Sequence, residues 1–264
     1  MTNRARIGPA ESYRTPVRYD RHMSIPNESH PAPSALVVPP RDVAPPHGIE
    51  RLGAARLATE RTLPIDPILG ALLGADGLVR GQAVACRGPA ARSLAIAAAA
   101  SAVTLGSWVA VLGIDDLGVE AAADAGLPLE RLVRVRPGAD GVRVWADLCL
   151  AALDGFELLL TSPPGRVPSP LATAIRRRLR SRAGCLLVVG NPHGLEVDVE
   201  ISSAAPSWRG IGTGTGRLAD RCVEVRASGR RVHRGGAAVV SLPGSDGRLH
   251  APEAVASGLV RTAV

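Results

Sequence analysis

Apolar residues in the central part of the chain form short runs that alternate with longer segments of helical spacing. The runs of strand length are Gln82–Arg87, Ser107–Ile114, Leu132–Val135, Phe156–Thr161 and Cys185–Gly190. The helical segments between them are Ala90–Thr104, Leu117–Ala125, Val142–Leu153 and Pro170–Arg182. Strands that alternate with helices predict a parallel sheet covered by helices on both faces.

The alternation ends after the fifth run. Three more strand-like runs follow without intervening helices: Val197–Ser202, Cys222–Ala227 and Ala237–Leu242. A short helix, Ile65–Leu73, precedes the first strand and is ended by Gly74. We therefore expect an α/β protein: a three-layer sandwich with a mostly parallel central sheet and a C-terminal antiparallel extension.

The two ends of the chain differ in composition from its centre. Residues 1–47 contain nine of the 22 prolines and show no apolar periodicity, so we expect a disordered leader there. Residues 48–243 are the expected core domain, and residues 244–264, rich in Gly, Ala and Ser, a flexible tail. No apolar segment has the length of a signal core or a bilayer span, which predicts a cytoplasmic protein without a membrane partner.

Composition and charge narrow the possible functions. Apolar residues make up 46% of the chain and aromatic residues only 2%, so Ala, Val, Leu and Ile must fill the core. All 31 basic residues are arginine and the net charge is +7, which indicates either phosphate or acidic-partner binding or the codon bias of a GC-rich genome. The four cysteines form no CxxC pair, so no metal, redox site or cofactor is expected.

The turn between the first strand and its helix stands where a phosphate-binding loop would lie. Its sequence is Arg87-Gly88-Pro89-Ala90-Ala91-Arg92-Ser93-Leu94. A working loop needs a second glycine, a lysine for the β- and γ-phosphates and a Ser or Thr for magnesium. Gly88 and Pro89 remain, but Arg92-Ser93 is a poor substitute because a planar guanidinium does not replace an ammonium in a tight backbone nest. We expect a degenerate loop that binds no cofactor.

The second part of a nucleotide site is missing as well. The strand Phe156–Thr161 ends in Thr161, where a magnesium-directed carboxylate is expected. Glu157 stands at the other end of that strand, although sites in parallel sheets open at the carboxyl ends. Asp115 and Asp116 are interpreted as a cap for the helix beginning at Leu117. The sequence therefore predicts a protein that is not an enzyme.

Several segments together resemble a known family. The stretch Leu63–Asn191 resembles the core of RecA-type recombinases through its lead-in Leu69–Gly81, the Gly88-Pro89 opening and Ala125–Leu132. The longer stretch Leu63–Leu242 resembles the shortened RecA-like proteins of actinobacterial mutagenesis cassettes, the ImuA-prime type. The segment Ser207–Leu218 is its most family-specific piece.

The resemblance implies a function in the response to DNA damage. It implies an SOS-induced, non-catalytic accessory subunit for DNA repair by error-prone translesion synthesis. Its partners would be an inactive Y-family-like polymerase subunit and an error-prone replicative-type polymerase. It also implies a relation to SulA-like cell-division inhibitors, so inhibition of a tubulin-like GTPase is the alternative. The connections that contact DNA in RecA are short here (Pro163–Ser169 and Pro192–Leu195), so we expect DNA contact to be indirect or weak, with nucleoid association only on recruitment.

Two surface features are candidates for partner binding. The four alternating glycines from Gly210 to Gly216 lack the G-x-G-x-x-G spacing and the flanking helix of a dinucleotide loop. They are interpreted as a flexible loop between antiparallel strands, with partner binding as the alternative. The candidate partner-binding residues are Trp208, Arg209, Gly210, Gly212 and Arg217.

The second feature is an arginine-rich helix. Leu171, Ile175 and Leu179 recur on one side and predict the buried face, so the arginines are expected to face outward. They form either a solvated face or a patch for a phosphate backbone or an acidic partner. The arginines of this candidate patch are Arg176, Arg177, Arg178, Arg180 and Arg182.

Overall fold

A computed structural model describes residues 61–138, 141–211, 216–230, 232 and 236–252 of the chain. These residues all belong to one compact unit, Val38–Val264. The leader expected at 1–47 and the last part of the expected tail, 253–264, lie outside the described residues.

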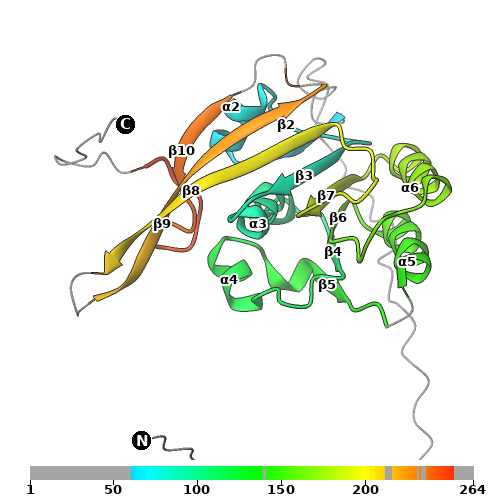
Figure 1. Cartoon of the computed structure of the whole chain (residues 1–264), viewed down its shortest axis with the longest axis horizontal. Coiled ribbons are helices and arrows are strands. Elements are labelled where there is room, and N and C mark those ends of the chain that lie inside the picture. The colour runs from blue at the N-terminus through cyan, green and yellow to red at the C-terminus, as the bar shows by residue number, and fades with distance from the viewer. Residues whose placement is uncertain (1–60, 139–140, 212–215, 231, 233–235, 253–264) are drawn as a thin grey trace, which may run out of the picture. The chain divides into compact units, whose positions relative to one another are not determined.

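A mostly parallel sheet forms the centre of the described structure. Its eight strands follow the order β10-β9-β8-β3-β7-β6-β4-β5 (Figure 1). Their bounds are β3 Ala83–Arg87, β4 Val109–Leu112, β5 Leu132–Val135, β6 Leu158–Thr161, β7 Cys185–Val189, β8 Val199–Ile211, β9 Gly216–Gly229 and β10 Ala237–Ser241. The first six in chain order pair in parallel, while β9 and β10 are antiparallel to their neighbours. The expected fold class is confirmed.

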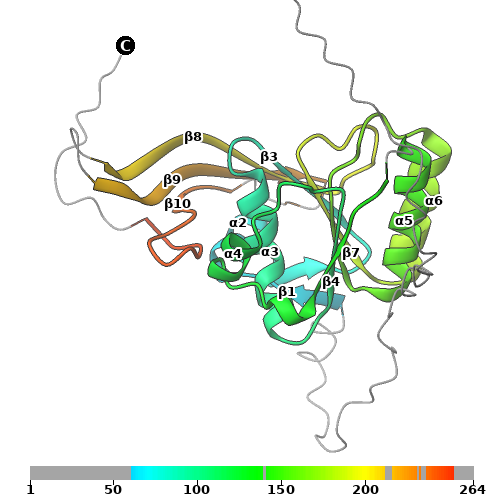
Figure 2. The ribbon, with the colours of Figure 1, turned by 90° about the horizontal axis from the view of Figure 1, so that it is seen from below.

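Helices cover the parallel part of the sheet on both faces (Figure 2). Their bounds are α2 Pro67–Leu73, α3 Ala91–Thr104, α4 Val119–Asp124, α5 Gly141–Gly155 and α6 Ser169–Ser181, with a 3₁₀ turn at Leu129–Arg131. Helices α2, α3 and α4 pack on one face and α5 and α6 on the other. The alanines of α3 are buried along most of the helix, because their small side chains allow close packing on the sheet. No helix in the described ranges is long and apolar enough to cross a membrane.

The structure also contains strands that the sequence pattern did not indicate. A small antiparallel ribbon, β1 (Thr62–Pro64) with β2 (Gly77–Val79), brackets α2. Strands β8 and β9 are longer than the predicted runs Val197–Ser202 and Cys222–Ala227 and extend to the glycine-rich segment, whose residues 212–215, interpreted as part of a loop, lie outside the described residues. Here β8 runs to Ile211 and β9 begins at Gly216, with two register irregularities between them. The sequence pattern did not indicate the added strand residues because their side chains show no alternation of apolar and polar residues, although they pair across the hairpin.

The residues just after β10 pack against the sheet. Ser241 and His250 form an isolated bridge, and Leu249 belongs to the core that contains α3. Residues 244–250, which were expected to belong to the flexible tail, are therefore folded onto the domain.

A buried ion pair connects α6 to the sheet. The Asp198 carboxylate accepts hydrogen bonds from both terminal nitrogens of Arg176 and, at 3.0 Å, from the Ala83 N–H. The Arg176 and Asp198 side chains are only 12% and 9% exposed. The expectation that all five arginines of α6 face outward is wrong for Arg176, because its guanidinium is needed to neutralise this carboxylate.

Removal of the buried carboxylate should be far more destabilising than removal of a surface one. We expect Asp198→Ala to lower the free energy of unfolding by about 3–5 kcal/mol, because it leaves the Arg176 charge and the Ala83 N–H without their acceptor. The matched control is Asp154→Ala on α5, which breaks the half-exposed pairs with Arg178 and Arg182 and should cost about 1 kcal/mol or less. Urea unfolding of both variants measures the difference, and equal losses would contradict a supporting role for the Arg176–Asp198 pair.

Candidate functional site

The turn after β3 lies directly against strand β8. Gly88 has φ +85°, and a Cβ atom there would stand 2.0 Å from the Ser203 carbonyl oxygen and 2.8 Å from its Oγ. Only glycine fits at this position, because the turn needs both the left-handed conformation and the missing side chain.

The Ser203 hydroxyl fills the turn. Its Oγ accepts a hydrogen bond from the Ala90 N–H at 2.9 Å and donates one to the Arg87 carbonyl at 2.9 Å. The next N–H, that of Ala91, donates to the Gly88 carbonyl at 3.1 Å. A phosphate-binding loop directs such N–H groups at the ligand. Here two of them are bonded within the protein.

The side chains of Arg92 and Ser93 also have partners within the protein. Arg92 forms an exposed ion pair with Asp116 at 2.6 Å, and the Ser93 Oγ accepts a hydrogen bond from Arg221 at 3.0 Å. The interpretation of Asp115 and Asp116 as a helix cap is wrong. Helix α4 begins at Val119, its N-cap residue is Gly118, and no side chain caps it.

In a nucleotide site, the end of strand β6 would carry a carboxylate for magnesium. Here that position is Thr161, which accepts a hydrogen bond from the indole of Trp145. Thr161 is fully buried at the end of β6, where its Oγ1 accepts from the Trp145 Nε1–H at 2.9 Å and donates to the Leu112 carbonyl at 3.0 Å. Trp145 of α5 is itself fully buried. The site therefore holds a satisfied hydrogen-bond chain between α5, β6 and β4.

Arg221 of β9 joins the turn to the β8–β9 hairpin. Its guanidinium donates to the Leu242 carbonyl at 2.7 Å and to the Ser93 hydroxyl, and lies 5.3 Å from the centroid of the Trp208 ring. Burial lowers the pKa of Arg221, although the group stays charged at any physiological pH. Trp208 is 46% exposed. A half-exposed tryptophan is thus held in place by a cation–π contact to an anchored arginine.

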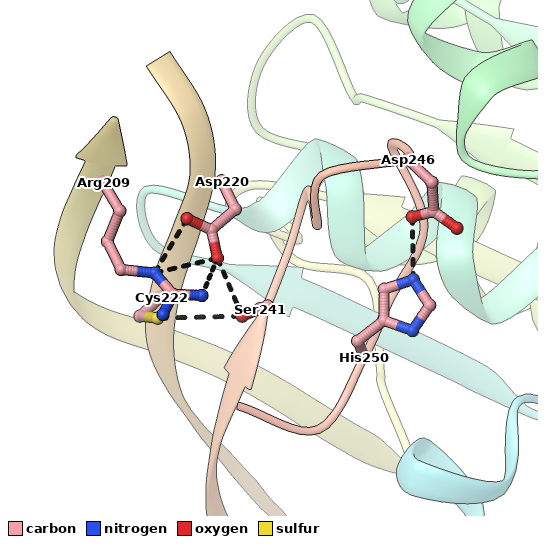
Figure 3. Close-up of polar contacts among 6 residues, drawn as sticks. All are labelled: Arg209, Asp220, Cys222, Ser241, Asp246 and His250. Atoms are coloured by element: carbon pink, nitrogen blue, oxygen red, sulfur yellow. Dashed lines mark hydrogen bonds and ion pairs between the residues drawn. The ribbon is translucent and has the colours of Figure 1, made fainter. Parts of the chain in front are cut away.

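The next cross-strand pair of the hairpin is a nearly buried ion pair. Arg209 Nε donates to both oxygens of the Asp220 carboxylate, at 2.8 and 3.0 Å, and Ser241 Oγ lies 3.4 Å from the same carboxylate (Figure 3). The hydrogen bonds from Arg209 lower the pKa of Asp220. Together with His250, which pairs with Asp246 at 2.7 Å, these residues border a cavity of about 440 Å³.

The other expected site residues are distributed differently from the prediction. Gly210 lies in the hairpin at a register irregularity with φ +100°, Gly212 lies outside the described residues, and only the backbone of Arg217 is described. On α6, Arg178 and Arg182 pair with Asp154, so Arg177 and Arg180 are the exposed arginines of the patch without an ion-pair partner among the described residues. Internal pairing thus neutralises much of the expected basic patch.

Ser203 and Arg221 were not recognised as site residues from the sequence. They contact the turn across sequence separations of 113 and 128 residues. No local pattern marks such contacts, because they depend on the strand order of the sheet.

Comparisons with known proteins agree with this architecture. The MT3502 N-terminal domain family matches residues 71–194. The chain is 32% identical over 149 residues to the uncharacterized protein Rv3395c of Mycobacterium tuberculosis, and the match covers 53% of this chain and 71% of that protein. The chain belongs to the same family as Rv3395c.

The fold of this Rv3395c-family chain is similar to that of a solved structure. A crystal structure of the RadB recombinase superposes with a TM-score of 0.51 at 16% identity, covering 70% of this chain and 96% of the recombinase chain. The similarity confirms the expected RecA-like fold and establishes the fold alone.

The contact between Gly88 and Ser203 predicts a position-specific glycine effect. We expect Gly88→Ala to lower the free energy of unfolding by roughly 1–3 kcal/mol more than Gly74→Ala, because only the first methyl group collides with β8. Gly74 is a matched control, since it also has a positive φ but a Cβ atom added there would meet no atom within 4 Å. Chemical denaturation measures both variants, and a smaller loss for Gly88→Ala would contradict the close contact.

The lowered pKa of Asp220 predicts a pH-dependent contribution to stability. A carboxyl whose folded pKa lies below its unfolded value stabilises the fold above that unfolded value, about 3.9, and the stabilisation is lost as the pH falls through the folded pKa. We expect Asp220→Asn to lower the Tm at pH 7 and the difference from the natural protein to shrink at pH 3. The exposed control Asp147→Asn should leave the Tm at pH 7 nearly unchanged. A difference for Asp220→Asn that is independent of pH would contradict the ion pair.

Proposed function

We propose that this protein is a non-catalytic RecA-like accessory subunit of an error-prone translesion synthesis complex. It acts through protein–protein contacts with an inactive Y-family-like polymerase subunit and an error-prone replicative-type polymerase. The family membership and the RecA-like fold support a RecA-related protein, and the resemblance to actinobacterial mutagenesis proteins supports this particular role.

The proposal that the protein is non-catalytic rests on the turn after β3, where the Ser203 hydroxyl already accepts the hydrogen bond from the Ala90 N–H. A nucleotide would have to displace the Ser203 hydroxyl from the Ala90 N–H, and the turn offers no ammonium group for the β- and γ-phosphates. At the neighbouring strand end, a magnesium ion would meet the Trp145–Thr161 hydrogen bond instead of a carboxylate. Both positions favour a non-catalytic scaffold rather than a nucleotide-dependent enzyme.

Damage-induced mutagenesis in living cells tests the proposal. We expect deletion of the gene to reduce the frequency of mutations induced by ultraviolet light, because the error-prone polymerase would lose its accessory subunit. An Arg92→Glu variant should restore that frequency fully, since among the described residues the ion-pair partner of Arg92 is the exposed Asp116 and the proposed scaffold needs no phosphate ligand. The matched control is Arg143→Glu, which reverses another exposed, ion-paired arginine.

Two outcomes would contradict this function. An Arg92→Glu protein that is expressed normally but fails to restore mutagenesis, while Arg143→Glu restores it, would indicate a working anion site. Unchanged mutagenesis in the deletion strain, together with filamentation of undamaged cells on overexpression, would favour the cell-division inhibitor.

A further inference from the structure

The distal half of the β8–β9 hairpin extends beyond the strands that support its base. We call residues 204–210 and 218–221 the hairpin arm. Strand β3 pairs with β8 only as far as Ser202, and β10 pairs with β9 from Cys222 onward, with backbone hydrogen bonds of Leu242 and Pro243 that extend this contact to Arg221. In both views the arm extends past the end of β3 and away from α5 and α6 (Figures 1 and 2). An isolated two-stranded ribbon is only marginally stable in water, so this arm depends on its anchors.

Contacts at the base of the arm hold it rigidly. Ser203 fixes β8 to the turn after β3, and Arg221 connects β9 to Ser93 and to the Leu242 carbonyl. The Arg209–Asp220 pair then links the two strands of the arm itself. A surface that is ordered before binding loses less conformational entropy when a partner binds.

The arm presents apolar side chains to solvent. Trp208 is 46% and Leu218 is 49% exposed. The exposed smaller residues of the arm are Ala204, Ala205, Pro206 and Ala219. An exposed tryptophan held by surrounding contacts is the residue type most enriched at energetic centres of protein interfaces.

The charge of this segment is basic. The hairpin arm contains two arginines, Arg209 and Arg221, and one aspartate, a formal charge of +1. The aspartate, Asp220, is only 9% exposed at its side chain and already accepts hydrogen bonds from Arg209. The described residues of the arm therefore present no exposed carboxylate beside Trp208 and Leu218.

We propose that the hairpin arm docks onto an acidic protein surface containing an apolar socket for Trp208. The contact is made by side chains, because Pro206 lacks an N–H and the irregularity at Ala205 interrupts the edge of β8 against strand addition. A nucleic acid fits less well, since a single tryptophan cannot stack successive bases and Leu218 offers nothing to a phosphate. This inference rests on the proposed accessory function and assigns its contact surface.

Binding of the full chain to the purified inactive polymerase-like subunit, measured by isothermal titration calorimetry, tests the assignment. We expect Trp208→Ala to weaken the affinity about 10-fold or more. Trp108→Ala is the control, because the Trp108 ring centroid also lies 5.8 Å from an arginine guanidinium, that of Arg131, but Trp108 directly precedes β4, which lies far from β8 and β9 in the strand order. The control should leave the affinity unchanged, and the Tm of each variant checks its folding.

Two substitutions at one exposed position test the sign of the partner's charge. Leu218→Glu and Leu218→Lys remove the same apolar side chain and add opposite charges, so an acidic partner should bind the Glu variant about 10-fold or more weakly than the Lys variant. Leu105→Glu, which places the same charge at a 74% exposed position on the end of α3, should have no effect.

The outcomes separate this inference from the proposed function. Tight binding by the natural chain that neither Trp208→Ala nor Leu218→Glu weakens would overturn the arm as the contact surface and leave the accessory function intact. No binding by the natural chain would overturn both. Binding of a labelled single-stranded oligonucleotide that Trp208→Ala abolishes, without such an effect on the protein partner, would assign the arm to nucleic acid instead.

Discussion

The turn after β3 and the β8–β9 hairpin depend on one hydroxyl group, that of Ser203, which lies between the Arg87 carbonyl and the Ala90 N–H. The sheet register sets that position: β8 runs parallel to β3 with Ser202 opposite Arg87, so the following residue must meet the turn after β3. A side chain at position 88 would collide with it. Register, glycine and hydroxyl thus form one unit, and a change in any one of them disturbs the contacts of the other two.

That unit lies at the edge of the sheet formed by the carboxyl ends of its parallel strands. In this class of fold, ligands bind at the carboxyl ends of parallel strands, where loops and helix N-termini leave polar groups unpaired. Here the polar groups at the ends of β3 and β6 are paired internally, through Ser203, Arg221 and the Trp145–Thr161 bond. Internal pairing satisfies groups that a bound phosphate or metal would otherwise satisfy.

The layered fold was predictable from the sequence because strands and helices alternate along it with clear periods. The absent lysine and strand-end carboxylate were also visible, since each occupies a defined place in a local motif. The residues that take the place of the lysine and the carboxylate could not be predicted from the sequence. Ser203 and Trp145 are ordinary residues in the sequence. The strand order brings Ser203 to Gly88, and the packing of α5 on the sheet brings an indole to Thr161. Arg176 was misjudged for the same reason, because its partner Asp198 lies across a connection of unknown path.

The long hairpin and the turn after β3 are connected by the same contacts. Within the arm, cross-strand pairs such as Trp208–Arg221 and Arg209–Asp220 each contribute about 0.2–1 kcal/mol. Ordering a residue costs about 1–2 kcal/mol of backbone entropy, so these pairs alone do not hold the arm. Its order must come from the base, where Ser203 and Arg221 bind the turn and its helix. A nucleotide in that turn would compete for the same N–H and hydroxyl groups, and therefore the arm is most firmly held when the turn binds no ligand.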